Sequence, residues 1–210
     1  MTTLAACLAL AALGAPSTDM VGEGWAEASV LAPGPVRGAL VAELLAASDA
    51  ELDDDSQRLA YECATRAADA LELELALAIQ EPLHGRVGAV WSGYNLAVTR
   101  HRSGDSAGAD ALLGALLVDA GLGDRANLWN QRAIFALGDG RRVEAWAAFG
   151  RAMGLGSADA TAILAREDLA GHNLHRAKSG FRAALNRTPD HPWALRGWGL
   201  ALLSAPQPRD

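Results

Sequence analysis

The sequence is poor in the residues that build β-sheets and disulfide frameworks. Cys7 and Cys63 are its two cysteines, too few for a disulfide framework or a zinc site. Aromatic residues make up 5% of the chain, and runs of Val, Ile, Thr and Tyr are scarce between residues 36 and 185. Alanine and leucine dominate instead, and both lose little conformational freedom on entering a helix. The composition therefore predicts an all-α protein.

Recognisable catalytic motifs are missing as well. The sequence contains no Gly-x-Ser-x-Gly, no His-Glu-x-x-His and no phosphate-binding loop. His172 and His175, with Glu167 and Asp168 nearby, could be imagined as metal ligands. Solvated or helix-capping side chains explain these residues better, because they fall at a turn and a helix start. We therefore expect a protein that is not an enzyme, with no catalytic residues, no metal and no cofactor.

Lysine is nearly absent, and the negative charge is unevenly distributed. Lys178 is the single lysine, and the formal net charge is −7. Residues 1–82 carry 14 acidic and 3 basic side chains, whereas residues 83–210 carry 11 acidic and 15 basic ones. This distribution lacks the dense Lys/Arg face of a nucleic-acid binder. A GC-rich genome, and not a phosphate site, explains the preference for arginine. We expect a bacterial protein, and from its charge distribution we expect no nucleic-acid partner.

An apolar run at residues 3–15 is too short for a transmembrane helix, which needs ~20 residues. Its length suits a secretory signal peptide, although no Lys or Arg precedes it. The four residues ending at Cys7 also resemble a lipoprotein signal, but too few residues precede them. The alternative is an apolar helix packed on the body of a cytoplasmic protein. The sequence favours an exported or periplasmic protein.

Proline and glycine predict a linker over residues 16–35, with Trp25 docked onto the body of the protein. A helix follows over residues 36–48. A second helix starts near Asp55, a plausible N-cap, and continues to residue 80, where Glu81 and Pro82 end it. Leucine and glutamate alternate from residue 71 onward, as in a strand, but the flanking alanine-rich sequence favours helix. Residues 36–82 could hold a diverged repeat.

A repeated pattern organises the C-terminal half of the chain. Two trios lie 32 residues apart: Ala145, Phe149 and Ala152, then Ala177, Phe181 and Ala184. Their spacing of i, i+4 and i+7 places each trio on one helical face. A small–large–small face lets two helices pack closely, with one aromatic ring in the gap. We predict helix pairs that bury their apolar faces by stacking on their neighbours.

These residues and the turns between them resemble the tetratricopeptide repeat (TPR), a family whose unit is two antiparallel helices in about 34 residues. The first-helix motif is matched by Asn95, Leu96, Ala97, Trp129, Asn130, Ala133, Leu164 and Ala165. The turn is matched by Gly104, Asp105 and Gly140, and Pro189 closes the third unit. Units are predicted to start near residues 90, 126, 158 and 192, the last being a capping helix before a polar tail at 205–210. The third unit departs from the family pattern at Asp168 and His172.

The resemblance implies a short right-handed α-solenoid over about residues 90–204, in which the first helix of each pair lines a concave groove. Transferred position by position, candidate partner-binding residues are Trp91, Tyr94, His101, Asn127, Asn130, Arg166, Trp193 and Arg196. The implied function is a non-enzymatic scaffold or adaptor that binds a protein or peptide partner. The family's clamp for C-terminal carboxylates also needs a lysine, which does not accompany Asn130. The alternative is a structural subunit of a larger multiprotein assembly, held through its helix ends and edges.

Overall fold

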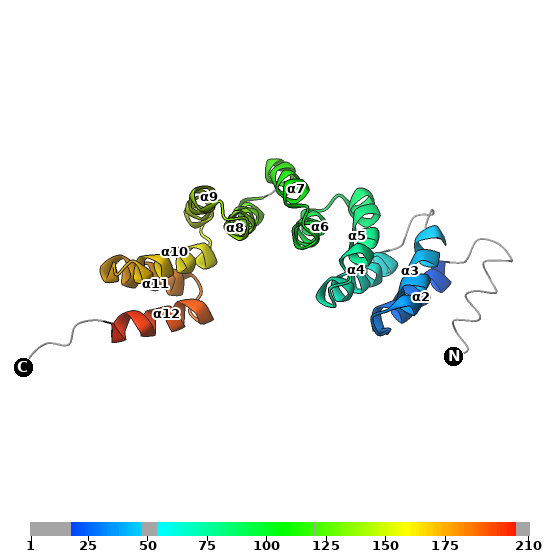
Figure 1. The fold of residues 1–210 in the computed structure, drawn as a ribbon, viewed down its shortest axis with the longest axis horizontal. Helices are drawn as coiled ribbons and strands as arrows, with labels where there is room; N and C mark the ends of the chain where they lie inside the picture. The colour runs from blue at the N-terminus through cyan, green and yellow to red at the C-terminus, as the bar shows by residue number, and fades with distance from the viewer. Residues whose placement is uncertain (1–17, 48–53, 120, 205–210) are drawn as a thin grey trace, which may run out of the picture. The chain divides into compact units, whose positions relative to one another are not determined.

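The computed structural model describes residues 18–47, 54–119 and 121–204, and every regular element in these ranges is an α-helix (Figure 1). The all-α fold class is therefore confirmed for this part of the chain. Two compact units divide the chain, unit 1 at residues 1–109 and unit 2 at residues 110–210. The apolar run at 3–15, with its two interpretations, and the tail at 205–210 lie outside the described residues. Within those residues, every helix is too short or too polar to cross a bilayer.

The helices follow one another in both units with short connections. Unit 1 contains α2 (Thr18–Val30), α3 (Pro35–Ala47), α4 (Asp54–Asp69), α5 (Leu73–Val87) and α6 (Val90–Arg102). Helix α7 (Ser106–Asp119) begins in unit 1 and ends in unit 2. Unit 2 continues with α8 (Leu122–Gly138), α9 (Arg142–Gly154), α10 (Ala158–Ala170), α11 (Leu174–Arg187) and α12 (Pro192–Leu203).

The same kind of turn joins the two helices in each of four successive pairs. Three residues separate the helices, and the middle residue has a positive φ: 64° at Leu71, 97° at Gly104, 78° at Gly140 and 61° at His172. At Gly104, its own N–H donates to the carbonyl of His101 at 3.1 Å, and the next N–H donates to the carbonyl of Arg100 at 2.9 Å. The other three turns repeat both bonds. This pattern is the Schellman motif, which satisfies the last carbonyl groups of a helix. The same turn, at Gly156, also joins α9 to α10. Following the repeat pattern of the sequence, we group the helices into four hairpins, α4–α5, α6–α7, α8–α9 and α10–α11, whose members we call first and second helices.

The single helix expected over residues 55–80 is wrong, because the chain forms a hairpin there. Helix α4 ends at Asp69, Leu71 takes the left-handed conformation, and α5 runs through Pro82 to Val87. The turn is invisible in the sequence because a leucine occupies the position that glycine takes in two of the other hairpins. Pro82 does not end the helix, and its exposed ring lies on the outer side of α5. The α4–α5 hairpin overlaps the later part of residues 36–82, in which the sequence suggests a diverged repeat, and that repeat stays a prediction.

The linker expected over residues 16–35 is also wrong for residues 18–30, which form α2. Helix α2 packs on α3 and α4, and Trp25 is completely buried, as its predicted docking requires. The glycines that suggest a linker serve close packing instead. A Cβ atom on Gly24 would lie 2.5 Å from Cδ2 of Leu44, so glycine allows α2 to approach α3 closely.

A buried ion pair ties the N-terminal helices to the first hairpin within unit 1. The side chain of Arg37, at the start of α3, is 2% exposed and pairs with the carboxylate of Glu72 in the α4–α5 turn. Arg37 also donates to the carbonyl of Leu31 at 3.3 Å. Nearby Cys63 is completely buried, and this burial raises the pKa of its thiol. The core of unit 1 therefore joins helices from both sides of the α4–α5 turn.

In unit 2 the predicted Ala–Phe–Ala faces form the core. Phe149 and Phe181 are 0% and 1% exposed, and the alanines on either side of them are completely buried. Phe181 of α11 contacts α12 so closely that a Cβ atom on Gly197 would lie 2.2 Å from the ring. The expected start near residue 126 is late by one turn, because α8 already begins at Leu122. Stacking of α9 on α10, and of α11 on α12, then follows as the repeat pattern predicts.

Candidate functional site

The eight residues that the TPR resemblance assigns to the groove all lie on first helices or on α12. Trp91, Tyr94 and His101 lie on α6 in unit 1. Unit 2 holds the others: Asn127 and Asn130 on α8, Arg166 on α10, Trp193 and Arg196 on α12. Three pairs are three residues apart and so share a helical face. His101 follows Tyr94 by seven residues, which places it two turns further along the same side of α6. Arg166 is the single member of the set on α10.

Counting back from the left-handed residue of each turn places these side chains in a common frame. Trp91 and Asn127 each lie 13 residues before it, and Tyr94 and Asn130 each lie 10 residues before it. The same count from Leu71 identifies Arg58 and Tyr61 on α4. Sequence reasoning missed these two residues, because nothing in the sequence marks Leu71 as a turn. Unit 1 therefore adds an arginine and a tyrosine to the candidate surface.

An edge-to-face ring pair forms the aromatic part of this surface. The rings of Tyr61 and Trp91 have centroids 4.7 Å apart and an interplanar angle of 86°. Trp91 nevertheless keeps 46% of its surface exposed. The side chain of Asn95 donates to the carbonyl of Trp91 at 2.8 Å and so holds the start of α6. Burial raises the pKa of the Tyr61 hydroxyl above its ordinary value. The pair combines an apolar ring surface with a hydrogen-bonding hydroxyl group.

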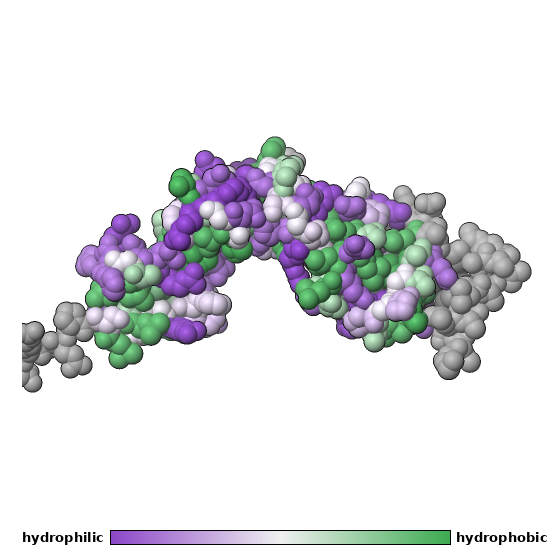
Figure 2. All heavy atoms as spheres, in the orientation of Figure 1, coloured by the Kyte–Doolittle hydropathy of each residue, from purple (hydrophilic) through white to green (hydrophobic). Residues whose placement is uncertain are grey.

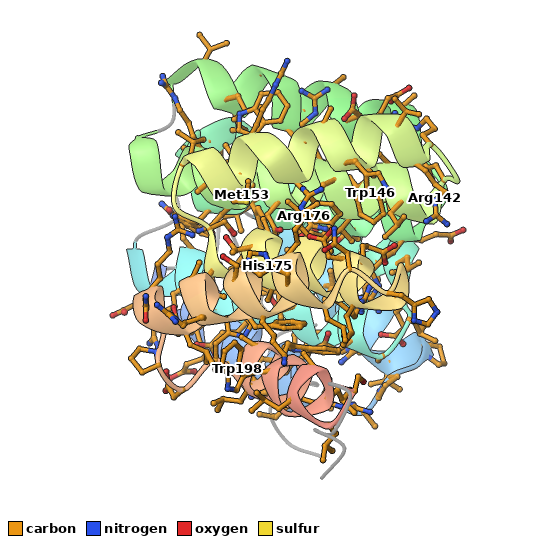
Figure 3. All side chains as sticks on the ribbon, turned by 90° about the vertical axis from the view of Figure 1, so that its left-hand side faces the viewer. Arg142, Trp146, Met153, His175, Arg176 and Trp198 are labelled. Carbon is orange, nitrogen blue, oxygen red and sulfur yellow. The ribbon has the colours of Figure 1, made fainter. Side chains whose placement is uncertain are left out.

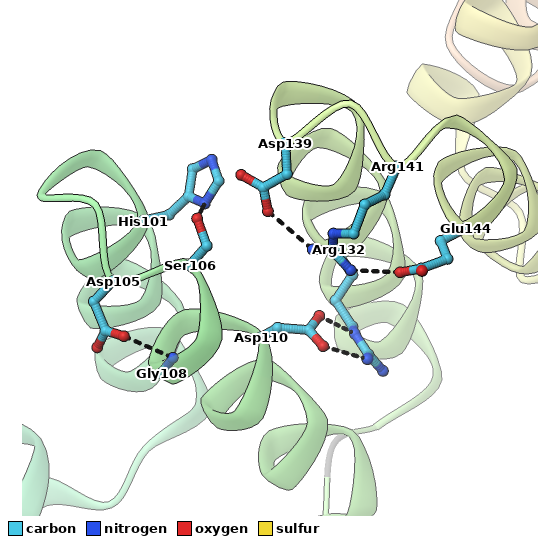
Figure 4. Close-up of polar contacts among 9 residues, drawn as sticks. All are labelled: His101, Asp105, Ser106, Gly108, Asp110, Arg132, Asp139, Arg141 and Glu144. Carbon is cyan, nitrogen blue, oxygen red and sulfur yellow. Dashed lines mark hydrogen bonds and ion pairs between the residues drawn. The ribbon is translucent and has the colours of Figure 1, made fainter.

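His101 is occupied at the end of α6 and differs from the other candidates in this respect. Its Nδ1 atom lies 3.2 Å from the hydroxyl of Ser106, at the start of α7 (Figure 4). In the same turn, the carboxylate of Asp105 accepts a hydrogen bond from the N–H of Gly108 at 2.8 Å. Such bonds satisfy free N–H groups at a helix start. His101 therefore supports the hairpin turn.

Unit 2 contains a cavity of 210 Å³ around Trp129, which sequence reasoning did not single out as a site. It lies on α8 and α9 beside the start of unit 2. The guanidinium carbons of Arg132 and Arg151 lie 5.1 Å and 4.4 Å from the centroid of the Trp129 ring. Two arginines on one ring would suit a planar or anionic ligand if their charges were free.

Carboxylates already neutralise most of the positive charge of this cavity (Figure 4). Arg132 donates two hydrogen bonds to Asp110, at 2.8 Å and 2.9 Å. Arg141 bonds to Asp139 at 3.0 Å and to Glu144, and these two carboxylates raise the pKa of its guanidinium. Bidentate pairs of this kind fix side-chain geometry. The ion pairs that line the cavity therefore hold neighbouring helices together. Within the described residues, no group of three His, Cys, Asp or Glu side chains could hold a metal ion.

The other candidates in unit 2 differ in how accessible they are. Asn127 is exposed, whereas the side-chain oxygen of Asn130 is buried and has no hydrogen-bond partner among the described residues. Arg166 is 55% exposed and lies 3.9 Å from the carboxylate of Glu167. Trp193 is 64% exposed, and Arg196 is also exposed. The accessible part of this set is therefore at Asn127, Arg166 and the N-terminal half of α12.

The second helices of unit 2 present a different surface (Figure 3). Arg142, Trp146 and Met153 follow one another along α9, with the guanidinium of Arg142 lying 5.7 Å from the Trp146 ring. His175 and Arg176 lie in the first turn of α11, and both are exposed. His172 is exposed in the preceding turn. These residues occupy a turn and a helix start, where the sequence places them.

Comparison with known proteins finds similarity in structure but not in sequence. No protein-family model matches the sequence, and no curated protein is similar to it in sequence. The crystal structure of TTC0263, a thermophilic TPR protein of Thermus thermophilus, is similar with a TM-score of 0.55 and 20% sequence identity. The match covers 80% of this chain and 89% of that one. The likeness is one of fold, and it shows that this chain has the helical-repeat architecture of a TPR protein.

Proposed function

We propose that the protein is a non-enzymatic scaffold or adaptor that binds a protein partner through the surface of its first helices. One observation carries the proposal. Trp91 and Trp193 are the second residues of α6 and α12, and they keep 46% and 64% of their surface exposed. Tryptophan left in water loses the burial that stabilises it elsewhere, and it is enriched among residues that dominate binding energy. Two exposed tryptophans at the same position of their helices support a binding surface.

The chemistry of the neighbouring residues suggests what the surface takes. Around Trp91 lie Tyr61 and the half-buried Tyr94, and around Trp193 lies Arg196. Aromatic rings take apolar side chains, and arginine and asparagine pair with carboxylate or backbone groups. An extended peptide or an amphipathic helix with apolar anchors fits this description. Each unit presents its own part of the surface.

Site-specific photocrosslinking tests the proposal in the native host. A benzophenone amino acid replaces Trp91, Trp193 or Val143 in the full chain. Val143 is the matched control, because it is the second residue of a second helix, α9, and is 85% exposed. We expect a discrete protein adduct from position 91 or 193 and none from position 143. Equal adducts from all three positions would reject the first-helix surface.

Affinity measurement with the captured partner then tests the aromatic anchor. Trp91→Ala is expected to weaken binding roughly 30-fold, the effect of losing about 2 kcal/mol at an aromatic hot spot. Val143→Ala is the control and should bind as the natural protein does. An unchanged dissociation constant for Trp91→Ala would remove Trp91 from the binding surface.

The second candidate function is a structural subunit of a larger assembly, held through helix ends and edges. It is favoured by α12, where Leu195, Leu200 and Leu202 are each 49% exposed and Leu203 is 84% exposed. Apolar side chains on a stacked helix are normally buried by a neighbouring element. Sedimentation of the complex isolated from its host distinguishes the two functions, because an assembly subunit remains in a stoichiometric complex throughout purification.

A further inference from the structure

The side of α12 that faces away from its neighbours is apolar and open. Helix α12 packs on α10 and α11 through its buried residues Ala194, Gly197 and Ala201. We define the outer face of α12 as Leu195, Gly199, Leu202 and Leu203, which helical spacing places on one side. Nothing lies within 4 Å of the position that a Cβ atom on Gly199 would take. Apolar surface gathers over this helix (Figure 2).

On the preceding first helix, α10, the equivalent face is covered by α11. The two helices are antiparallel neighbours in one hairpin. Three contacts fix their register: Arg187 Nη1 to Thr161 Oγ1 at 3.0 Å, a Gly180 Cβ position 2.7 Å from Ala165 Cβ, and Arg176 Nε to Asp168 Oδ1 at 3.7 Å. A small residue at the centre thus lets α11 lie close on α10, and polar pairs close both ends.

The same three positions can be found on α12. Helices α10 and α12 begin at residues 158 and 192, so an offset of 34 residues relates them. Thr161, Ala165 and Asp168 then correspond to Leu195, Gly199 and Leu202. The centre is again small, but leucines replace the two polar residues. Within the described residues, no helix covers this face.

We propose that the outer face of α12 binds one amphipathic helix of a partner protein, antiparallel to α12, in the place that α11 takes on α10. The packing between first and second helices, established inside unit 2, thereby continues onto α12. The bound helix has a small residue over Gly199, because the backbones approach closely there. A large apolar residue four positions before this small residue covers Leu202. Another, seven positions after it, covers Leu195. Arginine at those two positions would bury a charge without a partner.

The need for apolar residues at the two positions that face Leu202 and Leu195 distinguishes the partner from a second copy of the chain. At the two positions in question, every second helix of the chain has at least one charged residue in its sequence: Arg86 on α5, Asp119 on α7, Glu144 on α9, and Arg176 and Arg187 on α11. A second copy therefore offers no second helix with apolar residues at both positions. The inference rests on the assembly role proposed above and is independent of the first-helix groove.

A peptide pair made from α11 tests the proposal on the full chain. The probe is a fluorescent peptide of residues 173–188, either with the natural sequence or with Arg176→Leu and Arg187→Leu together. Fluorescence anisotropy gives both dissociation constants. We expect the double-leucine peptide to bind at least about tenfold more tightly, because its leucines meet Leu202 and Leu195. Equal affinities of the two peptides would overturn the register.

Protein variants locate the binding face. Leu202→Asp and Leu195→Asp should each weaken binding of the double-leucine peptide at least about tenfold, because each places a charge under an apolar side chain. Val143→Asp puts the same charge on an exposed apolar position of α9 and should change nothing. Trp91→Ala should also leave this affinity unchanged, which separates this face from the groove. An unaffected Leu202→Asp variant overturns the proposal. So does concentration-dependent dimerisation, in sedimentation, that Leu202→Asp abolishes.

Discussion

Replacing Leu71 by glycine is expected to stabilise unit 1, although leucine is usually the better residue for a folded protein. Leu71 has a φ of 64°, and a side chain in the left-handed region costs roughly 1–2 kcal/mol. The side chain is 72% exposed, so its removal forfeits little burial. Glycine itself lowers the free energy of unfolding by roughly 0.5–1 kcal/mol, because it gives the unfolded chain more conformational freedom. Subtracting the middle values of these two ranges gives a net gain of roughly 0.75 kcal/mol in the free energy of unfolding.

Urea unfolding of the full chain, followed by far-UV circular dichroism, measures this gain. A thermal scan should show a rise in the midpoint of roughly 2–8 °C, if unit 1 unfolds as a domain of about 100 residues. His172→Gly relieves the same strain in unit 2 and should stabilise that unit by a similar amount. The comparison tells whether the two turns are equivalent.

Ala70→Gly is the matched control, one residue earlier and without a positive φ. It should destabilise unit 1 by about 0.5–1 kcal/mol, the cost of unneeded glycine in ordered backbone. The reasoning fails if Leu71→Gly destabilises the protein as Ala70→Gly does. That result would mean that Leu71 contributes packing that outweighs the strain of its backbone.

Two further predictions concern the cores of the units. Phe181→Ala should lower the free energy of unfolding by about 3–5 kcal/mol, because the buried ring also contacts Gly197, and chemical denaturation of unit 2 will measure it; unchanged melting would contradict the stacked-helix core. The protein should also lose stability as pH rises above about 8.5, the ordinary thiol value, because burial raises the pKa of Cys63 so that only the unfolded state ionises there. Cys63→Ala should flatten this decline, and an identical slope in both proteins would exclude the thiol as its cause.

The helical class and the later hairpins could be predicted because their signals are local. The Ala–Phe–Ala faces follow helical spacing, and Gly140 marks a turn that needs positive φ. The first hairpin could not be found in this way. Its turn depends on the hydrogen bonds around Leu71 and on the contact of Glu72 with Arg37, which lies 35 residues away. Long-range contacts of this kind leave no periodic trace in a sequence.

Glycine misled the interpretation of the N-terminal helices for a related reason. Gly24 lies inside α2, where a side chain would collide with Leu44. From the sequence alone, a glycine that permits close packing cannot be told from one that breaks a helix, because only the neighbouring helix decides between them. Prediction of the candidate surface from the sequence has the same limit. Trp91 could be named from its position in the repeat, but its partner Tyr61 required the turn at Leu71.

The constant turn also has an evolutionary consequence. Three residues always join the two helices inside a hairpin, whereas two to four residues join one hairpin to the next element. Length variation is therefore confined to the seams between modules. Duplication or deletion of a whole hairpin at these connections keeps every turn inside the hairpins intact. The number of repeats can therefore change by recombination without the evolution of a new loop.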